Sequence, residues 1–308
     1  MKYLQLIRWK NLIMIAYIFI LIKYFFLNPL NIPSFLNDFQ YILFTLSIIL
    51  ISAAGYVVND IYDMGMDKIN KPEKVVVGKA ISKDQAFNIY TGLNMIGLAI
   101  GFYLSYLIDH INFAFVYVAS SLLLYQYAVS LKKIFIVGNF VISLLAGVSI
   151  FIIVLYDLLP AITDDNGVLI YQAFKIISVF SIFAFVITLI REIVKDIEDL
   201  EGDRKFGVKS LAIEIGTDRT KKIASAISIL PLISIFYYSL NYLTLQTYSL
   251  VYIFIFIELP LLYFAIKINL ANKKSDFKRM STLLKLIMFT GISSIFVFTL
   301  IFKLNYAF

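Results

Sequence analysis

The chain of 308 residues contains no cysteine, a single histidine and few charged side chains. Without cysteine it has no disulfide framework, no catalytic thiolate and no zinc-thiolate site. The single imidazole, His110, excludes a metal centre built on paired histidines. Charged residues make up 15% of the chain and hydrophobic residues 61%. A soluble protein of this composition would expose more apolar surface than its polar side chains could offset, which predicts a membrane protein rather than a soluble enzyme or a nucleic-acid-binding protein.

Long apolar stretches indicate how often the chain crosses the bilayer. A helix needs roughly 20 apolar residues to cross a hydrocarbon core about 30 Å thick. No linker rich in Gly, Ser or Pro separates the stretches into two groups. We therefore expect an all-α polytopic membrane protein, a bundle of nine transmembrane helices that forms a single domain over residues 1–308. The nine expected spans are residues 12–30, 41–62, 84–107, 112–130, 134–156, 171–195, 220–240, 246–268 and 281–303.

The positions of the basic residues predict the orientation of these spans, because Lys and Arg near span ends are retained on the cytoplasmic side. All of the 27 Lys and Arg residues except Lys23, Lys175 and Lys303 fall at the N-terminus or at the loops after even-numbered spans. We therefore expect the N-terminus on the cytoplasmic side of the cell membrane and the C-terminus outside. This topology also accounts for the net charge of +7 without a nucleic-acid partner.

Two acidic clusters stand at the expected cytoplasmic ends of spans two and six. In each cluster three aspartates are separated by three and then four residues, and residues at this spacing share one face of an α-helix. Each cluster is thus predicted to present a column of three carboxylates. A single cluster would most often be a solvated helix end, but two with the same spacing on the same side indicate a common site. The aspartates are Asp60, Asp63 and Asp67 in the first cluster and Asp196, Asp199 and Asp203 in the second.

The carboxylates require a neutralising partner, because like charges on one helix face repel and are costly to desolvate near lipid. Mg²⁺ binds carboxylates together with phosphate oxygens and water. Two facing columns could hold Mg²⁺ with a bridging diphosphate, while an apolar cavity among the helices takes the lipid tail. The positive-inside pattern alone also explains individual lysines, but the cations available to contact the phosphate groups are Lys71, Lys74, Lys132, Lys133, Arg191 and Lys195.

The two clusters resemble the signature motifs of the UbiA-type intramembrane prenyltransferase superfamily. They stand in the family's order, on the second and sixth of nine expected helices, and the resemblance extends over nearly the whole chain. The first motif reads Asn59-Asp60-x2-Asp63-x3-Asp67-x2-Asn70-Lys71-Pro72, and the second reads Asp196-x2-Asp199-x2-Gly202-Asp203.

The resemblance implies an enzyme that binds a polyprenyl diphosphate with Mg²⁺, forms an allylic carbocation by loss of diphosphate and alkylates a second substrate. Metal ions would stabilise the charge on the departing diphosphate, and a dry cavity would protect the cation from water. The family's pattern makes all six aspartates metal ligands, directly or through water, with a catalytic role for Asp60, Asp63, Asp196 and Asp199. The residues that it places against the substrate or its diphosphate are Asn59, Lys132, Lys133 and Arg191.

Two stretches of the second motif are similar to different branches of the family. Residues 191–199 look most like geranylgeranylglycerol-phosphate geranylgeranyltransferases, which use geranylgeranyl diphosphate to alkylate a lipid acceptor such as geranylgeranylglyceryl phosphate. Residues 201–207 are equally similar to homogentisate and other quinone-precursor prenyltransferases, so an aromatic acceptor is the alternative. The family's usual Arg-Pro pair after the first motif is replaced by Glu73-Lys74, where Lys74 could substitute for the arginine. With His110 on the opposite side, any general base would be a carboxylate, a tyrosine or the diphosphate itself.

A cation transporter is the alternative that is not an enzyme, because acidic residues within polytopic membrane proteins commonly mark ion pathways. The acidic clusters, however, stand at the cytoplasmic helix ends rather than at the midplane. Within the spans, Glu258 is the main ionisable residue, and the sequence does not explain it.

Overall fold

Membrane-crossing α-helices form almost the entire protein. A computed structural model describes residues 2–242 and 247–306, and nine helical segments in these ranges are long and apolar enough to cross a bilayer. Within the same ranges no β-strand is formed, which confirms the all-α prediction. The main helices are α2 (Trp9–Ile22), α3 (Asp38–Asn70), α4 (Lys83–Leu107), α5 (Ala114–Val129), α6 (Val137–Ile153), α7 (Gly167–Glu198), α10 (Thr217–Tyr242), α11 (Thr247–Ile253) with α12 (Leu259–Leu270), and α13 (Lys274–Tyr306).

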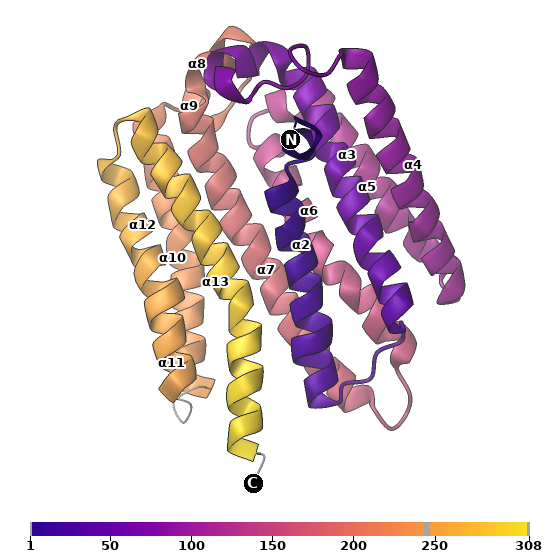
Figure 1. Ribbon diagram of the computed structural model, residues 1–308. Helices are drawn as coiled ribbons and strands as arrows, with labels where there is room; N and C mark the ends of the chain where they lie inside the picture. Colours follow the sequence, from indigo (N-terminus) through magenta and orange to yellow (C-terminus); the bar gives the residue numbers. More distant parts are fainter. Residues whose placement is uncertain (1, 243–246, 307–308) are drawn as a thin grey trace.

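Short helices and turns connect these spans. The N-terminal helix α1 lies with α8 and α9 at one end of the bundle, and the last helix, α13, runs toward the opposite end (Figure 1). The short helices are α1 (Lys2–Leu6), α8 (Leu200–Lys205) and α9 (Leu211–Glu214). The 3₁₀ turns are η2 (Asn28–Leu30), η3 (Pro72–Lys74), η4 (Ile111–Phe113), η5 (Leu131–Lys133) and η7 (Leu159–Ala161).

The first acidic cluster lies on one continuous helix, as the spacing predicted. A capping box between Asn37 and Gln40 starts α3, which continues to Asn70, well past the expected end of the second span at residue 62. The second cluster differs. Helix α7 ends at Glu198, and the chain turns at Asp199 before α8 begins, so Asp203 lies on a different helix from Asp196. The expectation of a second three-carboxylate column on one helix is therefore wrong.

Three π-helical turns interrupt the spans, and a proline follows each of them at the same distance. Proline lacks the backbone N–H, and its ring clashes with the carbonyl group four residues earlier in an α-helix. In each case that earlier residue lies within the wider π-turn, which relieves the clash. The turns are η1 (Lys23–Leu27) before Pro29, η6 (Val154–Leu158) before Pro160, and η8 (Phe254–Glu258) before Pro260.

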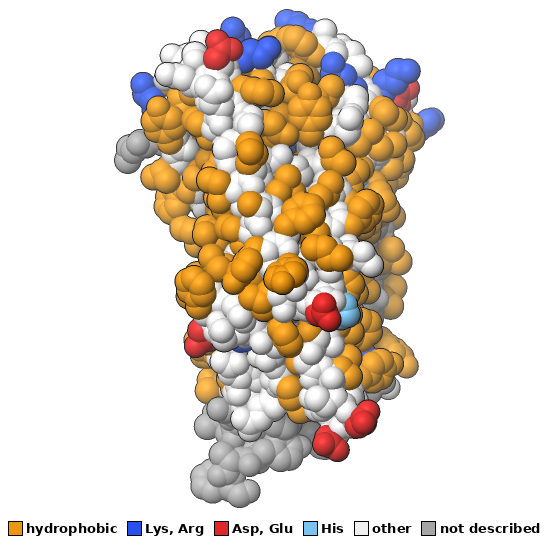
Figure 2. Space-filling model, turned by 90° about the vertical axis from the view of Figure 1, so that its right-hand side faces the viewer, with side chains coloured by type: hydrophobic (Ala, Val, Ile, Leu, Met, Phe, Trp, Pro, Cys, Tyr) orange, Lys and Arg blue, Asp and Glu red, His pale blue; other side chains and the backbone are white. Residues whose placement is uncertain are grey.

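Small residues let the helices approach closely, as is typical of membrane bundles. A Cβ at Gly97 would lie 3.2 Å from the Ser47 carbonyl oxygen, where α4 packs against α3. The Ser181 hydroxyl donates to the Gly147 carbonyl oxygen at 2.7 Å, where α7 packs against α6. The flank in Figure 2 is largely apolar, and Lys and Arg side chains gather at one end of it. The chain is an integral, multi-pass membrane protein, and this polar end carries the acidic clusters.

At the other end of the bundle a buried ion pair ties two spans to the loop before α3. The Lys23 ammonium lies 3.1 Å from the Asp157 carboxylate, and both side chains are almost fully buried. Lys23 also donates to Ser34 and to the Leu36 carbonyl, while Asp157 accepts the Leu36 backbone N–H. These bonds satisfy both charges, so burying them is tolerated.

Candidate active site

A cavity of about 1040 Å³ opens among α2, α3, α5, α6, α7 and α13. One face of α3 follows it over most of its length, because cavity-lining residues recur at helical spacing from Ile48 to Asn70. Ile48 and Asp63 are fifteen residues apart, which corresponds to about 22 Å at a rise of about 1.5 Å per residue. The cavity is therefore long enough along α3 to take an extended chain.

The two ends of this cavity differ in chemistry. The apolar end includes Ile48, Tyr117 and Ile150, and Tyr117 is almost fully buried there. The polar end contains all six aspartates of the two motifs. The structure thus brings together the two clusters that lie more than a hundred residues apart in the sequence. The side chains are Asp60, Asp63, Asp67, Asp196, Asp199 and Asp203.

On α3, cations and an amide position the first aspartates. The Asn59 side-chain amide donates to Asp63 at 2.7 Å, and the Lys132 ammonium, which follows α5, contacts the other Asp63 oxygen. The Arg8 guanidinium donates to Asp60 at 2.8 Å. Arg8 adopts a left-handed backbone conformation with φ of 51° between α1 and α2. Such strain in a residue other than glycine is typical of functional sites, and here it accompanies the contact with Asp60.

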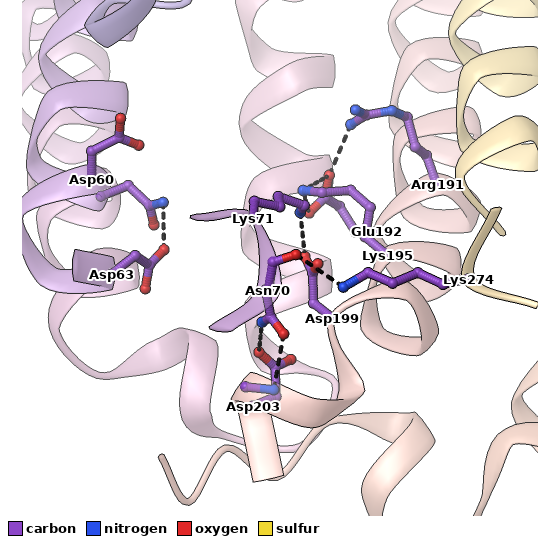
Figure 3. A network of polar contacts seen from close by, with 12 residues as sticks. Asp60, Asp63, Asn70, Lys71, Arg191, Glu192, Lys195, Asp199, Asp203 and Lys274 are labelled. Atoms are coloured by element: carbon purple, nitrogen blue, oxygen red, sulfur yellow. Dashed lines mark hydrogen bonds and ion pairs between the residues drawn. The ribbon is translucent and has the colours of Figure 1, made fainter. Parts of the chain in front are cut away.

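On α7, the second group of aspartates has separate partners. The Asn139 amide on α6 donates to Asp196 at 3.0 Å. The Lys71 ammonium, just after α3, forms an ion pair with Asp199 at 2.6 Å (Figure 3). Burial acts to lower the pKa of Lys71, but the neighbouring carboxylates, Asp199 above all and then Glu198 and Asp67, together raise the pKa above its ordinary value. Lys71 is therefore a fully charged cation within the site.

Asn70 joins the two motifs directly. Its side-chain oxygen accepts the Gly202 backbone N–H at 2.9 Å, and its amide group lies 3.4 Å from Asp203 (Figure 3). The Lys274 ammonium, at the start of α13, donates to the Asn70 carbonyl oxygen at 2.9 Å. Because the helix is interrupted at Asp199, the chain turns and brings Gly202 and Asp203 back toward α3. Asn70 of the first motif thus fixes the position of the second motif.

Of the other predicted substrate-binding residues, two line the cavity and Lys133 does not. Arg191 and Lys195 line the cavity, and both bond the buried carboxylate of Glu192, at 3.1 and 2.8 Å (Figure 3). Lys133 is exposed and is not part of the cavity wall. The side chain of Lys74 lies outside the described residues.

Other residues of the site were not among the predicted contacts. Arg8, Glu192 and Lys285 line the cavity, and Asn139 bonds Asp196 behind it. Arg8 and Glu192 carried a weak signal as polar residues beside a span or motif, but Lys285 had none because a basic residue at a cytoplasmic span end is ordinary. The mid-span Glu258 does not line the cavity, although it is buried at the end of η8.

Comparison with known proteins shows the family of this chain. The model of the UbiA prenyltransferase family matches residues 15–292. The chain belongs to this family. This UbiA prenyltransferase is 36% identical to a digeranylgeranylglyceryl phosphate synthase of Korarchaeum cryptofilum over 79% of this chain and 80% of that one. It is 30% identical to the Methanobrevibacter smithii protein of the same name over 93% and 96% of the two chains. The protein is therefore a membrane-embedded prenyltransferase.

Solved structures show the same fold. A structure from work on digeranylgeranylglyceryl phosphate synthase in membranes superposes with a TM-score of 0.64 at 26% identity, over 97% of each chain. A UbiA homologue of Archaeoglobus fulgidus bound to GPP and Mg²⁺ superposes with a TM-score of 0.59 at 16% identity, over 96% of this chain and 99% of that one. The second likeness supports the fold alone.

The oxygen atoms of the UbiA site suit a hard divalent cation. Among the described residues, the Oδ1 atoms of Asn59 and Asp199 are buried without a hydrogen-bond partner. Burial, with the nearby charges of Asp199 and Asp63, raises the pKa of Asp203 to about 7. In the described ranges no group of three or more acidic side chains is arranged as a metal cage. The two buried oxygen atoms without a partner suit Mg²⁺, a hard cation that takes oxygen ligands and completes its shell with water and phosphate oxygens.

Proposed function

We propose that this enzyme transfers a prenyl group from a polyprenyl diphosphate, with geranylgeranyl diphosphate as the expected donor, to a hydroxyl group of a glycerol lipid phosphate such as geranylgeranylglyceryl phosphate. The observation that carries the proposal is the cavity, which joins two aspartate motifs at one end to a long apolar channel at the other. The names of the relatives that cover most of the chain support the glycerol lipid acceptor.

In this proposal the donor diphosphate lies at the polar end of the cavity. Mg²⁺, held by Asp60, Asp63 and Asp67 and by Asp196, Asp199 and Asp203, would stabilise the negative charge that develops on the leaving group. Lys71 and Lys132 already lie against these aspartates and are placed to contact phosphate oxygens. Asn59 holds Asp63 in position from one turn earlier on α3.

The prenyl chain extends from this end along α3 toward Tyr117. The protein contributes by excluding water from the prenyl group. Ser52, Gly55 and Tyr56 continue the cavity wall below the aspartates, and the neighbouring helices complete that wall. A dry channel preserves the allylic cation until the acceptor reaches it. Tyr56 also stacks under the Arg8 guanidinium, 5.0 Å from the ring centre, which fixes Arg8 above the channel.

The bonds change in a simple order. The bond between the first prenyl carbon and the diphosphate oxygen breaks, and its electron pair leaves with the diphosphate. A lone pair of the acceptor hydroxyl then forms the new carbon–oxygen bond. The hydroxyl proton passes to the departing diphosphate, whose oxygen becomes more basic as the ester bond breaks. The products are a glycerol ether and protonated diphosphate.

Purified protein in detergent with labelled geranylgeranyl diphosphate tests the proposal directly. Geranylgeranylglyceryl phosphate and homogentisate are offered separately, with Mg²⁺ or with a chelator, and ether product and diphosphate are measured together. We expect labelled glycerol ether in amounts equal to the released diphosphate, and no turnover with the chelator. Label transferred only to homogentisate would instead assign the enzyme to quinone-precursor chemistry. Turnover that continues in the presence of the chelator would show that the reaction does not require Mg²⁺.

A further inference from the structure

The cavity contains a second charged region, opposite in sign to the aspartate motifs. Its residues come from α2, α7 and α13 and the turn before α2, and all of them line the cavity wall. We call this region the basic subsite. Its residues are Arg8, Lys10, Asn11, Arg191, Lys195 and Lys285.

Lys285 is the centre of the basic subsite. Its ammonium donates to the side-chain oxygen of Asn11, a neutral group, and among the described residues it forms no ion pair. The charges that act on it most strongly are the cations Arg191, Lys10, Arg8 and Lys195. Like charges held together in a partly buried site are unfavourable unless an anion joins them.

Arg191 adds an unused donor to this excess charge. Its Nη1 atom donates to Glu192, but its Nε atom is buried and has no hydrogen-bond partner among the described residues. Glu192 is shared between Arg191 and Lys195, so one carboxylate serves two cations. Figure 3 shows Arg191 beside α13, on the other side of the view from Asp60 and Asp63. The unsatisfied donor therefore lies apart from the aspartates of α3.

The three helices of the basic subsite continue as apolar wall below it. Lys285 is followed at helical spacing by Met288 and Ile292, and Asn11 is followed by Ile15 and Ile18. On α7, which runs in the opposite direction toward the site, Ala184 lies two turns before Arg191, and the hydroxyl of Thr188 between them contacts the Met288 sulfur. Each helix thus presents a polar group at the polar end of the cavity and apolar side chains below it. This is the pattern that an amphiphile with an anionic head requires.

We propose that the basic subsite binds the phosphate group of the acceptor lipid, with Lys285 and Arg191 as its contacts, while the donor diphosphate occupies the aspartate end. This inference rests on the proposed function, because it assigns the binding site for the acceptor of that same reaction. Lys71 and Lys132, which bond the aspartates, serve the donor, and Lys285 and Arg191 serve the acceptor, although Arg191 was expected at the donor diphosphate. Arg191 suits this role because a planar guanidinium presents several donors to phosphate oxygens at once.

Substitution of Lys285 tests this assignment. Lys285→Met removes the charge and keeps the length of the side chain, and Lys278→Met removes an exposed lysine earlier on the same helix as a matched control. For each protein we would measure kcat/KM with geranylgeranylglyceryl phosphate and with geranylgeranylglycerol, the same acceptor without phosphate. The binding of a non-reactive thiodiphosphate analogue of the donor, in the presence of Mg²⁺, is measured separately.

We expect the preference for the phosphorylated acceptor to fall on the order of 10- to 100-fold in Lys285→Met, as for the loss of a charged hydrogen bond. Donor-analogue binding should stay unchanged, which also reports an intact fold, and turnover of geranylgeranylglycerol should fall much less than turnover of the phosphorylated acceptor. Lys285→Arg should retain the preference, and Lys278→Met should match the wild type. A preference that is unchanged in Lys285→Met, or weaker donor-analogue binding in its place, overturns the subsite.

The same assay separates this inference from the proposed function. Wild-type protein that alkylates geranylgeranylglyceryl phosphate, with an unchanged preference in Lys285→Met, overturns the subsite alone. Wild-type protein that alkylates homogentisate and neither glycerol acceptor overturns the proposed function and the subsite together.

Discussion

Asn70 accepts a hydrogen bond from the backbone of Gly202, and this contact holds the two aspartate motifs at a fixed separation. A Cβ at Gly202 would lie 2.5 to 2.6 Å from atoms of the Asn70 side chain, which is too close for any side chain without movement. Glycine is required here for close approach rather than for an unusual backbone angle. Any change at this contact shifts Asp199 and Asp203 relative to the aspartates of α3.

Gly202→Ala should therefore impair catalysis. The added methyl group pushes Asn70 away, and misplacement of reacting groups by about 1 Å can cost about 100-fold in rate. We expect kcat/KM to fall by about that factor. Gly207 also has open space around it, but its φ of 70° would strain an alanine, so Gly207→Ala is not a suitable control. Gly167→Ala, which meets no neighbouring atoms at the far end of α7, is the matched control. Full activity in Gly202→Ala would show that the contact does not position the motifs.

Replacement of Asp63 or Asp196 by alanine should abolish turnover without loss of the fold. Each side chain is an oxygen ligand candidate at the polar end of the cavity. We expect a loss of roughly 100-fold or more in kcat, because removal of a single group that stabilises the transition-state charge costs that much. Asp84→Asn, at an exposed position in the first turn of α4, provides the control. Thermal unfolding in detergent checks the fold, and near-normal turnover in either variant contradicts the metal assignment.

Tyr117 should limit the length of the prenyl chain. It lines the apolar end of the cavity, where its hydroxyl accepts from Ser47 at 3.1 Å and its ring packs against Tyr156. There we expect it to act as a barrier to the end of the prenyl chain. Tyr117→Ala removes this barrier and should raise the relative kcat/KM for a donor one isoprene unit longer than geranylgeranyl diphosphate. Tyr117→Phe keeps the ring and should retain the wild-type preference. An identical chain-length profile in all three proteins would place the barrier elsewhere.

The buried pair of Lys23 and Asp157 should stabilise the protein without taking part in catalysis. Asp157→Ala leaves the Lys23 ammonium buried without its partner, and such a loss typically costs about 3–5 kcal/mol in the free energy of unfolding. We expect a clearly lower unfolding temperature in detergent, with KM for both substrates unchanged at a temperature where the variant is folded. Asp165→Asn, in the exposed loop before α7, should leave the unfolding temperature unaltered. A stable Asp157→Ala protein would show that the loop is held by other contacts.

The sequence determined the features that depend on local chemistry. Composition alone required a membrane, because no soluble surface could cover so many apolar side chains, and span lengths gave the nine crossings. The first aspartate triplet lies on one helix as its spacing predicted, since helical periodicity is a property of neighbouring residues. The two motifs also identified the family before any spatial relation was known.

Tertiary structure decided how these elements meet. The break at Asp199 replaces a second helical column, because Gly202 must approach Asn70, a contact between residues 132 positions apart. Lys285 joins Asn11 across 274 positions, and no local pattern encodes that pair. Packing also separated cations that looked equivalent in the sequence. Lys132 enters the cavity while Lys133 stays exposed, because adjacent residues point in different directions and the fold determines which direction faces the site.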